Sequence, residues 1–215
     1  MVISTTLIYF RKDLFFIMNI TKKLSNTFLN FIKNNTSTSE EDLEKIYYGI
    51  QVIMLTASKS ILLFVIAYLL GIFKYVLISY VVLSFARNFA SGVHLNSTLQ
   101  CIITTFFLHF GNVYLSLNLS TNLLIRSIIF IISFLLILLY APADTEYRPL
   151  VSKKLRRDLK IKSIVVIVIS YIVILFIKNN VYANIITFSF LEASLLITPI
   201  VYKLFGRKYD NYKSI

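Results

Sequence analysis

The chain has 215 residues, of which 57% are hydrophobic and only 15% charged, and this composition excludes an ordinary soluble domain. The formal net charge of +12 is typical of basic cytoplasmic loops in a membrane protein, so it does not indicate nucleic-acid binding. A single cysteine rules out an internal disulfide. Two histidines and one cysteine without paired metal-ligand spacing, and without a glycine-rich phosphate loop, predict neither a metal nor a cofactor.

The first part of the chain is not predicted to span a membrane. Residues 1–17 are too short to cross a bilayer and lack the basic start and cleavage site of a signal peptide, and Met18 is an alternative start. Residues 18–35 carry Ile20, Leu24, Phe28, Phe31 and Ile32 on one helical side and Lys22, Lys23 and Lys33 on the other. This pattern predicts an amphipathic helix that lies in the membrane interface or, equally, packs on the protein's own surface.

Beyond a loop in which Ser39 and Asp42 have the spacing of a helix cap, the sequence contains apolar runs long enough to span a bilayer. Six membrane segments are predicted, at about 46–70, 72–87, 98–118, 123–141, 162–177 and 182–204. The runs are apolar on all sides, which favours an all-α polytopic helical bundle over a barrel. The second and fifth are short, so they tilt, thin the bilayer or insert in part.

Lysines and arginines are distributed unevenly among the predicted loops. They gather in 142–162 and after 202, whereas the turns at 70–75, 118–123 and 178–181 hold one lysine at most. Six spans with both termini cytoplasmic satisfy every loop and place the polar stretch 87–97 on the cytoplasmic side. The expected organisation is an N-terminal extension with an interfacial helix over 1–45, a transmembrane domain over 46–205 and a basic cytoplasmic tail over 206–215.

The polar stretch contains His94, seven residues before Cys101, the only cysteine. A thiol with an imidazole close by is the minimal pair for nucleophilic acyl transfer. On one continuous helix the two residues would lie ~10 Å apart along the axis, which is long for a contact. The alternative is that Cys101 is an inert small hydrophobic residue in a membrane helix.

A helix break between the two residues would bring them closer. Ser97 and Gln100 have the S-x-x-Q spacing of a capping box, which predicts that a new helix starts there with Cys101 in or just beyond its first turn. His94 then lies in the preceding loop, made supple by Gly92, and can fold back over the helix start. Both the helix N-terminus and the imidazole favour the thiolate form of a cysteine.

The pattern R-x-x-x-x-G-x-H-x-x-x-x-x-x-C over 87–101, between two membrane helices, resembles the AgrB family (accessory gene regulator protein B). The resemblance covers about residues 19–205. It includes the amphipathic start, YYGIQ at 47–51, YAPADTE at 140–146 and the lysine-rich loop that follows. The family often has two glycines before the histidine, and here Ser91 takes the place of one.

This resemblance implies a membrane cysteine endopeptidase of Gram-positive quorum sensing, with Cys101 as the nucleophile and His94 as its general base. Its partner would be an AgrD-type precursor peptide with an amphipathic leader, a central segment with an internal cysteine or serine, and an acidic tail. Cys101 would release the tail and hold the peptide as a thioester, which closes to a thiolactone or lactone autoinducer. A homodimer and contacts with membrane lipids are consistent with the apolar surface.

Two other readings stay open. One is a small membrane transporter or peptide permease, which would use Lys59 and Glu192, two charges near mid-membrane. The other is a non-catalytic scaffold with an inert cysteine. A structural role is favoured for both charges, with Lys59 and Glu192 paired with each other or with neighbours such as Ser58, Ser60 and Ser194.

The remaining polar residues near the predicted site each have two interpretations. Arg87 can bind a substrate carboxylate or carbonyl, or anchor the helix at the cytoplasmic side. Lys153 and Lys154 match the family's basic loop and can receive the acidic tail, although topology alone also explains them. Gln100, with Ser97, can donate to an oxyanion, although capping explains both. The other groups are Asp144 and Glu146, which orient His94 or cap their loop, and His109, expected to pack inside the bundle.

Overall fold

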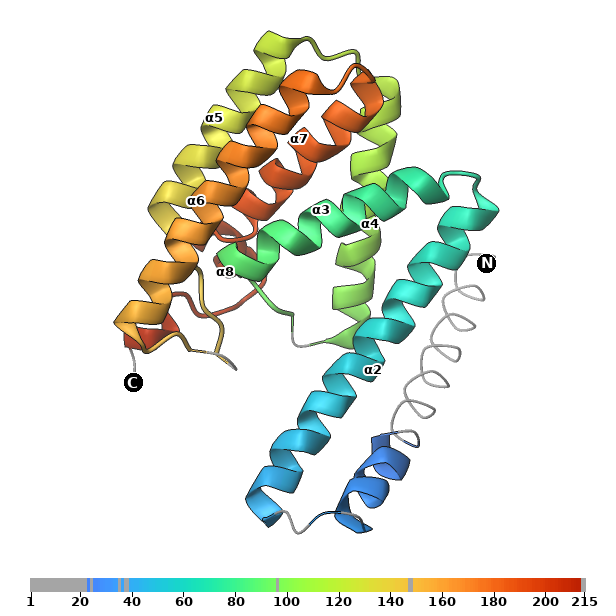
Figure 1. Cartoon of the computed structure of the whole chain (residues 1–215), viewed down its shortest axis with the longest axis vertical. Coiled ribbons are helices and arrows are strands. Elements are labelled where there is room, and N and C mark those ends of the chain that lie inside the picture. The colour runs from blue at the N-terminus through green and yellow to red at the C-terminus, as the bar shows by residue number, and fades with distance from the viewer. Residues whose placement is uncertain are drawn as a thin grey trace. The chain divides into compact units, whose positions relative to one another are not determined.

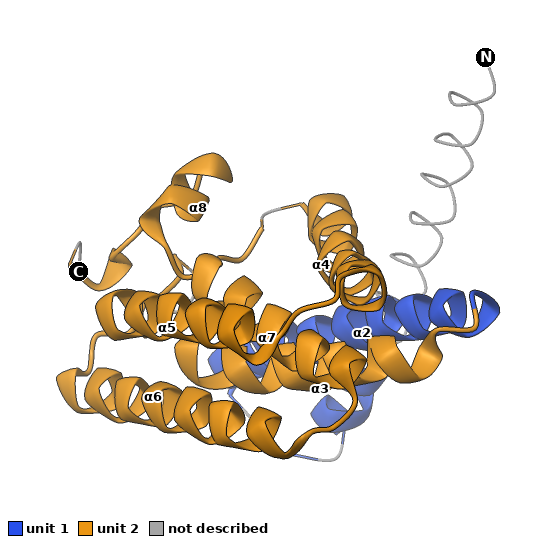
Figure 2. Cartoon of the chain, turned by 90° about the horizontal axis from the view of Figure 1, so that it is seen from above, with its two compact units in different colours: residues 1–70 blue, residues 71–215 orange. Residues whose placement is uncertain are grey.

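The computed structural model describes residues 23, 25–34, 36, 39–95, 97–146 and 149–213. The chain divides into two compact units, residues 1–70 and 71–215 (Figure 2). Within the described ranges the regular elements are helices, and β-pairing is limited to one isolated bridge between Ser91 and Ala143. The predicted all-α class is confirmed, while the predicted domain boundaries at 45 and 205 stay predictions.

In the first unit the chain forms helix α2 (Glu40–Leu69), which starts before the predicted position 46. Ser39 is its N-cap and accepts a hydrogen bond from the main-chain N–H of Asp42, so the predicted cap is confirmed. Three acidic residues in the first turn extend the helix backwards because negative charge stabilises a helix N-terminus. Of the predicted amphipathic helix, residues 25–34 are helical with Phe28 and Phe31 exposed; its residues 18–22, 24 and 35 lie outside the described residues.

The second unit contains the remaining helices (Figure 1). They are α3 (Phe73–Ala90), α4 (Thr98–Asn118), α5 (Leu123–Tyr140), α6 (Lys153–Phe176), α7 (Asn180–Leu195), α8 (Pro199–Leu204) and a final 3-10 turn, η1 (Asn211–Lys213). Helix α7 contacts α3, α4, α5 and α6, and nine of its 16 residues are buried. It is therefore the central helix around which the unit packs.

Two predicted segments differ from the observed helices. Helix α6 begins at Lys153 rather than near 162, because lysine, arginine and leucine are good helix formers and Ser152 caps its first turn. The predicted segment 182–204 is wrong as one helix, since α7 ends at Leu195. Pro199 has no N–H to continue a helix, and Thr198 caps the new helix α8 by accepting from the N–H of Val201.

Three helices, α2, α5 and α6, are long and apolar enough to cross a membrane. Many large apolar side chains on their surfaces are exposed, for example Leu139 (68%) and Phe176 (80%), as expected of helices that face lipid. The predicted count of six segments stays a prediction. In the second unit, the turns after α4 and α6 lie at one end, and the connections after α3 and α5 lie toward the other (Figure 1).

Candidate functional site

The loop between α3 and α4 is held on both sides by main-chain hydrogen bonds. The N–H of Gly92 donates to the oxygen of Ala143 (3.3 Å), and the N–H of Ala143 donates to the oxygen of Ala90 (3.0 Å). On the other side, the N–H of Val93 donates to the oxygen of Leu196 (3.1 Å) at the end of α7. The loop that leads to His94 therefore lies between the connection after α5 and the end of the central helix.

Gly92 is required by this close packing. Its φ of 125° lies in the region that glycine adopts readily, and a β-carbon there would lie 3.1 Å from the main-chain oxygen of Leu196. Ser91, with φ of 62°, is also in a left-handed conformation. The sequence predicts that Gly92 makes the loop supple, whereas in the structure it allows one fixed path in which the glycine is buried.

Arg87, in the last turn of α3, holds the same loop from within. Its Nη2 donates a hydrogen bond to the main-chain oxygen of Val93 over 3.0 Å. The guanidinium also interacts electrostatically with Cys101 and with Tyr202 of α8. The sequence predicts that Arg87 binds a carboxylate or carbonyl, and the carbonyl that it binds here belongs to its own chain.

His94 and Cys101 lie on either side of a helix start, as the sequence predicts. His94 is exposed in the loop, and Cys101 is a partly buried residue of α4. The N–H of Cys101 donates to the oxygen of Ser97 (3.0 Å), which closes the first helical turn, and Thr105 Oγ1 donates to the oxygen of Cys101 (2.7 Å). The loop and the helix start thus place an accessible imidazole and a thiol on one short segment.

The predicted capping box at this helix start is wrong. Ser97 occupies the N-cap position with an extended backbone, but its side chain makes no capping hydrogen bond. Ser97 and Gln100 are both exposed. Water can therefore satisfy the first-turn N–H groups, and the reciprocal side-chain bonds are not needed to start the helix. Gln100 lies one residue before Cys101 on the exposed surface of that turn.

Asp144 organises the connection after α5. Its carboxylate accepts hydrogen bonds from the main-chain N–H groups of Leu150 (3.3 Å), Asn211 (2.9 Å) and Tyr212 (2.8 Å). Of the two interpretations of Asp144, these contacts favour capping of the loop. Glu146 forms an ion pair with Arg207 (3.0 Å).

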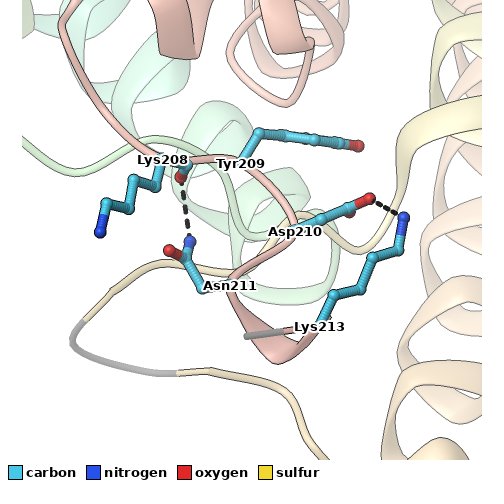
Figure 3. Close-up of a pocket in the computed structure, with 5 residues that line it drawn as sticks. All are labelled: Lys208, Tyr209, Asp210, Asn211 and Lys213. Carbon is cyan, nitrogen blue, oxygen red and sulfur yellow. Dashed lines mark hydrogen bonds and ion pairs between the residues drawn. The ribbon is translucent and has the colours of Figure 1, made fainter. Parts of the chain in front are cut away.

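The residues that follow α8 pack against this connection, which sequence reasoning missed. The Tyr209 ring stacks edge-on against Tyr202, with centroids 5.2 Å apart, and the Arg156 guanidinium lies 3.7 Å from the centre of the Tyr212 ring. A pocket of about 490 Å³ is lined by Lys208, Tyr209, Asp210, Asn211 and Lys213 (Figure 3). In the sequence, the signal for this packing is the presence of aromatic and amide residues within an otherwise basic tail.

Lys153 and Lys154 are the first two residues of α6, and both side chains are exposed. The first turn of α6 has no acidic residue, so positive side chains lie at the positive end of the helix dipole. They follow the connection that pairs with the His94 loop. This arrangement leaves a cationic surface that can receive a negatively charged partner.

The polar residues between α4, α5 and α7 form a separate, buried network. Glu192 accepts a hydrogen bond from Asn112 (3.2 Å), which also donates to Ser189 (3.0 Å), and Ser116 donates to Asn112 (3.2 Å). Further along, Asn184 bonds the oxygen of Ser116 and accepts from Arg126 (3.0 Å). Glu192 therefore has a polar neighbour, though not the predicted Ser194, which bonds Leu191 instead.

The other charge expected near mid-membrane, Lys59, lies in the first unit, so its pairing with Glu192 stays a prediction. His109 is buried and shares a hydrogen bond with Ser79 (Nδ1 to Oγ, 2.9 Å), and its ring packs on Tyr80. This confirms the prediction that His109 packs inside the bundle.

Apolar helices with exposed hydrophobic surfaces, three of them within the described residues long and apolar enough to cross a bilayer, define a helical membrane protein. The family model of accessory gene regulator B matches residues 25–198, and the chain belongs to this family. The assignment is consistent with a role in the accessory gene regulator system of quorum sensing.

Among curated proteins, the chain is similar to a putative AgrB-like protein of Clostridium acetobutylicum, with 32% identity over 84% of this chain and 88% of the relative. It is also similar to a putative AgrB-like protein of Listeria monocytogenes, with 28% identity over 84% of this chain and 89% of the relative. A third relative is accessory gene regulator protein B of Staphylococcus aureus, 26% identical over 86% of this chain and 97% of the relative. No solved structure matches the chain.

Proposed function

We propose that this protein is a membrane cysteine endopeptidase that removes the C-terminal tail of an AgrD-type precursor and promotes its cyclisation. The observation that carries the proposal is the segment 91–101. A loop fixed by hydrogen bonds on both sides presents an exposed His94 and leads directly into the helical turn that contains Cys101. Membership of the accessory gene regulator B family supports this peptide as the substrate.

In the proposed reaction, His94 takes the thiol proton of Cys101, and the thiolate attacks the carbonyl carbon at the junction with the tail. The amide C–N bond breaks, the proton from His94 goes to the leaving nitrogen, and the peptide stays on Cys101 as a thioester. The internal thiol or hydroxyl of the peptide then loses its proton to His94 and attacks the thioester. Ring closure releases the Cys101 thiolate, which takes its proton back from His94.

Arg87 has two roles in this proposal. Its hydrogen bond to Val93 fixes the loop, and its guanidinium interacts electrostatically with Cys101. Gln100, exposed in the turn before Cys101, would donate to the developing oxyanion. Lys153 and Lys154 would receive the acidic tail. We place both termini and this site at the cytoplasmic face, which is the side that the basic connections favour.

The deciding experiment is co-expression with the candidate precursor, with products read by mass spectrometry. Wild type is expected to release the tail peptide and form the ring, whereas Cys101→Ala and His94→Ala are not. Thr105→Val, which removes a hydroxyl one turn further along α4, is a control for disturbance of the helix and retains cleavage. If Cys101→Ala cleaves as well as wild type, the peptidase proposal is wrong and a transporter or scaffold takes its place.

A further inference from the structure

A short series of hydrogen bonds connects the carboxyl-terminal residues to the His94 loop. The N–H of Tyr212 donates to Asp144 Oδ2 (2.8 Å). The neighbouring residue, Ala143, accepts from the N–H of Gly92 (3.3 Å). Gly92 stands two residues before His94, so Asp144 is connected to the loop that carries the imidazole through Ala143 and its main-chain hydrogen bonds.

Residues 207–212 are here called the terminal strap. Asp144 accepts hydrogen bonds from this segment and holds it in place. Asp144 is only 3% exposed. Both of its carboxylate oxygens accept hydrogen bonds from main-chain N–H groups. Asn211 adds a side-chain hydrogen bond to the same carboxylate (3.4 Å). A buried carboxylate surrounded by N–H groups keeps its position only while those donors remain, because unpaired buried charge is costly.

Other contacts fix the strap to the same connection. Arg207, whose side chain is 5% exposed, pairs with Glu146 (3.0 Å), and the N–H of Lys208 donates to Glu146 Oε1 (3.2 Å). The Tyr202 hydroxyl donates to the main-chain oxygen of Asp144 over 2.7 Å. The terminal strap therefore packs against the connection that supports the loop.

We propose that Asp144 and the terminal strap position His94 for its work on Cys101, so that Asp144 is a positioning residue that acts through the loop. The inference rests on the proposed function of the His94 and Cys101 pair. A displacement of about 1 Å at a reacting group can lower a rate ~100-fold, so loss of the strap lowers turnover even though the strap does not contact the substrate.

The test uses the single cysteine as a site-specific probe. The rate at which iodoacetamide alkylates Cys101 is measured against pH in wild type, His94→Ala, Asp144→Asn and a chain that ends at Gly206. The pH profile of His94→Ala gives the alkylation rate of the Cys101 thiol when the imidazole is absent. Asp144→Asn places an NH₂ group against main-chain N–H donors, so at least one of the contacts is lost. Asp144→Asn and the chain that ends at Gly206 are here called the strap variants. The pH profiles of both are expected to shift toward that of His94→Ala.

Precursor cleavage provides the second readout. Both strap variants are expected to lower kcat about tenfold or more with KM unchanged, because the substrate surface is intact. A synthetic peptide of residues 207–215 added to the shortened chain is expected to restore much of the rate, which a general loss of folding would not allow. Lys213→Ala, which removes an exposed ion pair with Asp210, is the matched control and behaves like wild type.

The outcomes separate this inference from the proposed function. If wild type and His94→Ala have the same alkylation profile, the proposed pair is wrong. If His94→Ala differs but both strap variants match wild type, the pair stands and the positioning role is overturned. If Asp144→Asn and the shortened chain fail to insert in the membrane, Asn211→Ala tests the inference in their place. It removes the side-chain bonds to Asp144 and to the oxygen of Lys208 while the main-chain N–H of residue 211 is kept, and an unchanged kcat there overturns the inference.

Discussion

The main-chain N–H of Val93 donates a hydrogen bond to the main-chain oxygen of Leu196, which ties the residue before His94 to the end of the central helix α7. Leu196 is also the residue that a side chain at position 92 would contact first. The position of the histidine thus depends on where α7 stops, and the change of direction at Thr198 and Pro199 is part of the candidate site.

Gly92→Ala is expected to lower cleavage of the precursor at least about tenfold and to reduce thermal stability. A φ of 125° and a β-carbon 3.1 Å from the oxygen of Leu196 force the loop to move, at a cost of about 1–3 kcal/mol. Melting temperature in detergent and cleavage rate measure the effect. Gly111→Ala is the control, because a β-carbon there meets nothing within 4 Å, and it leaves both values unchanged or raised. Normal cleavage by Gly92→Ala would contradict the fixed loop.

Arg87→Lys is expected to slow cleavage about tenfold, since losing the hydrogen bond to Val93 removes roughly 1–1.5 kcal/mol from the fixed loop. Lysine keeps the positive charge but not the planar geometry of the guanidinium. Single-turnover cleavage measures the loss. Arg157→Lys, at an exposed position of α6, is the control and retains the wild-type rate. Equal rates for the two variants would show that charge alone matters at position 87.

Glu192→Gln and Glu192→Leu are expected to differ in stability. Glutamine still accepts the hydrogen bond of Asn112, whereas leucine removes one of the acceptors of that amide, in a residue 1% exposed, at a cost of about 0.5–1.5 kcal/mol. Thermal unfolding in detergent should therefore separate the two variants, with glutamine close to wild type and cleavage retained. If glutamine instead abolishes secretion of the product while cleavage and stability are normal, the transporter reading gains over a structural role.

The double substitution Lys153→Glu and Lys154→Glu is expected to raise KM for the precursor several-fold while kcat stays near wild type. Charge reversal at the exposed start of α6 repels an acidic tail, and the effect should shrink at high salt because screening weakens exposed charges. Lys203→Glu, exposed on α8, is the control. A lowered kcat without a change in KM would contradict a docking role for the two lysines.

The helices could be predicted from the sequence because long apolar runs and caps are local signals. The start of α4 at Thr98 and its end at Asn118 match the predicted 98–118. The helix break between His94 and Cys101 was also predictable from the polar stretch. The split after Leu195 was missed because the apolar run continues through it, and a proline and a threonine cap decide the outcome.

The contacts around Asp144 could not be predicted in the same way. Those with Asn211 and Tyr212 join residues that are more than sixty positions apart, and the donors are main-chain N–H groups, which every residue except proline carries. The fixed path of Gly92 was misjudged for a related reason. A glycine in a loop indicates freedom until the neighbouring chain, here Leu196, is known to lie against it.

The binding of residues 207–212 to the connection after α5 also affects how membrane orientation can be mapped. Topology is commonly read from reporters fused to a series of shortened chains. A reporter joined directly after α8 would remove the hydrogen bonds of Asn211 and Tyr212 to Asp144, so its signal would come from an altered protein. The side chain of Lys213 is 64% exposed, so a reporter placed after residue 215 leaves these bonds in place. Such a fusion reports on the orientation of a molecule in which the terminal strap is still bound.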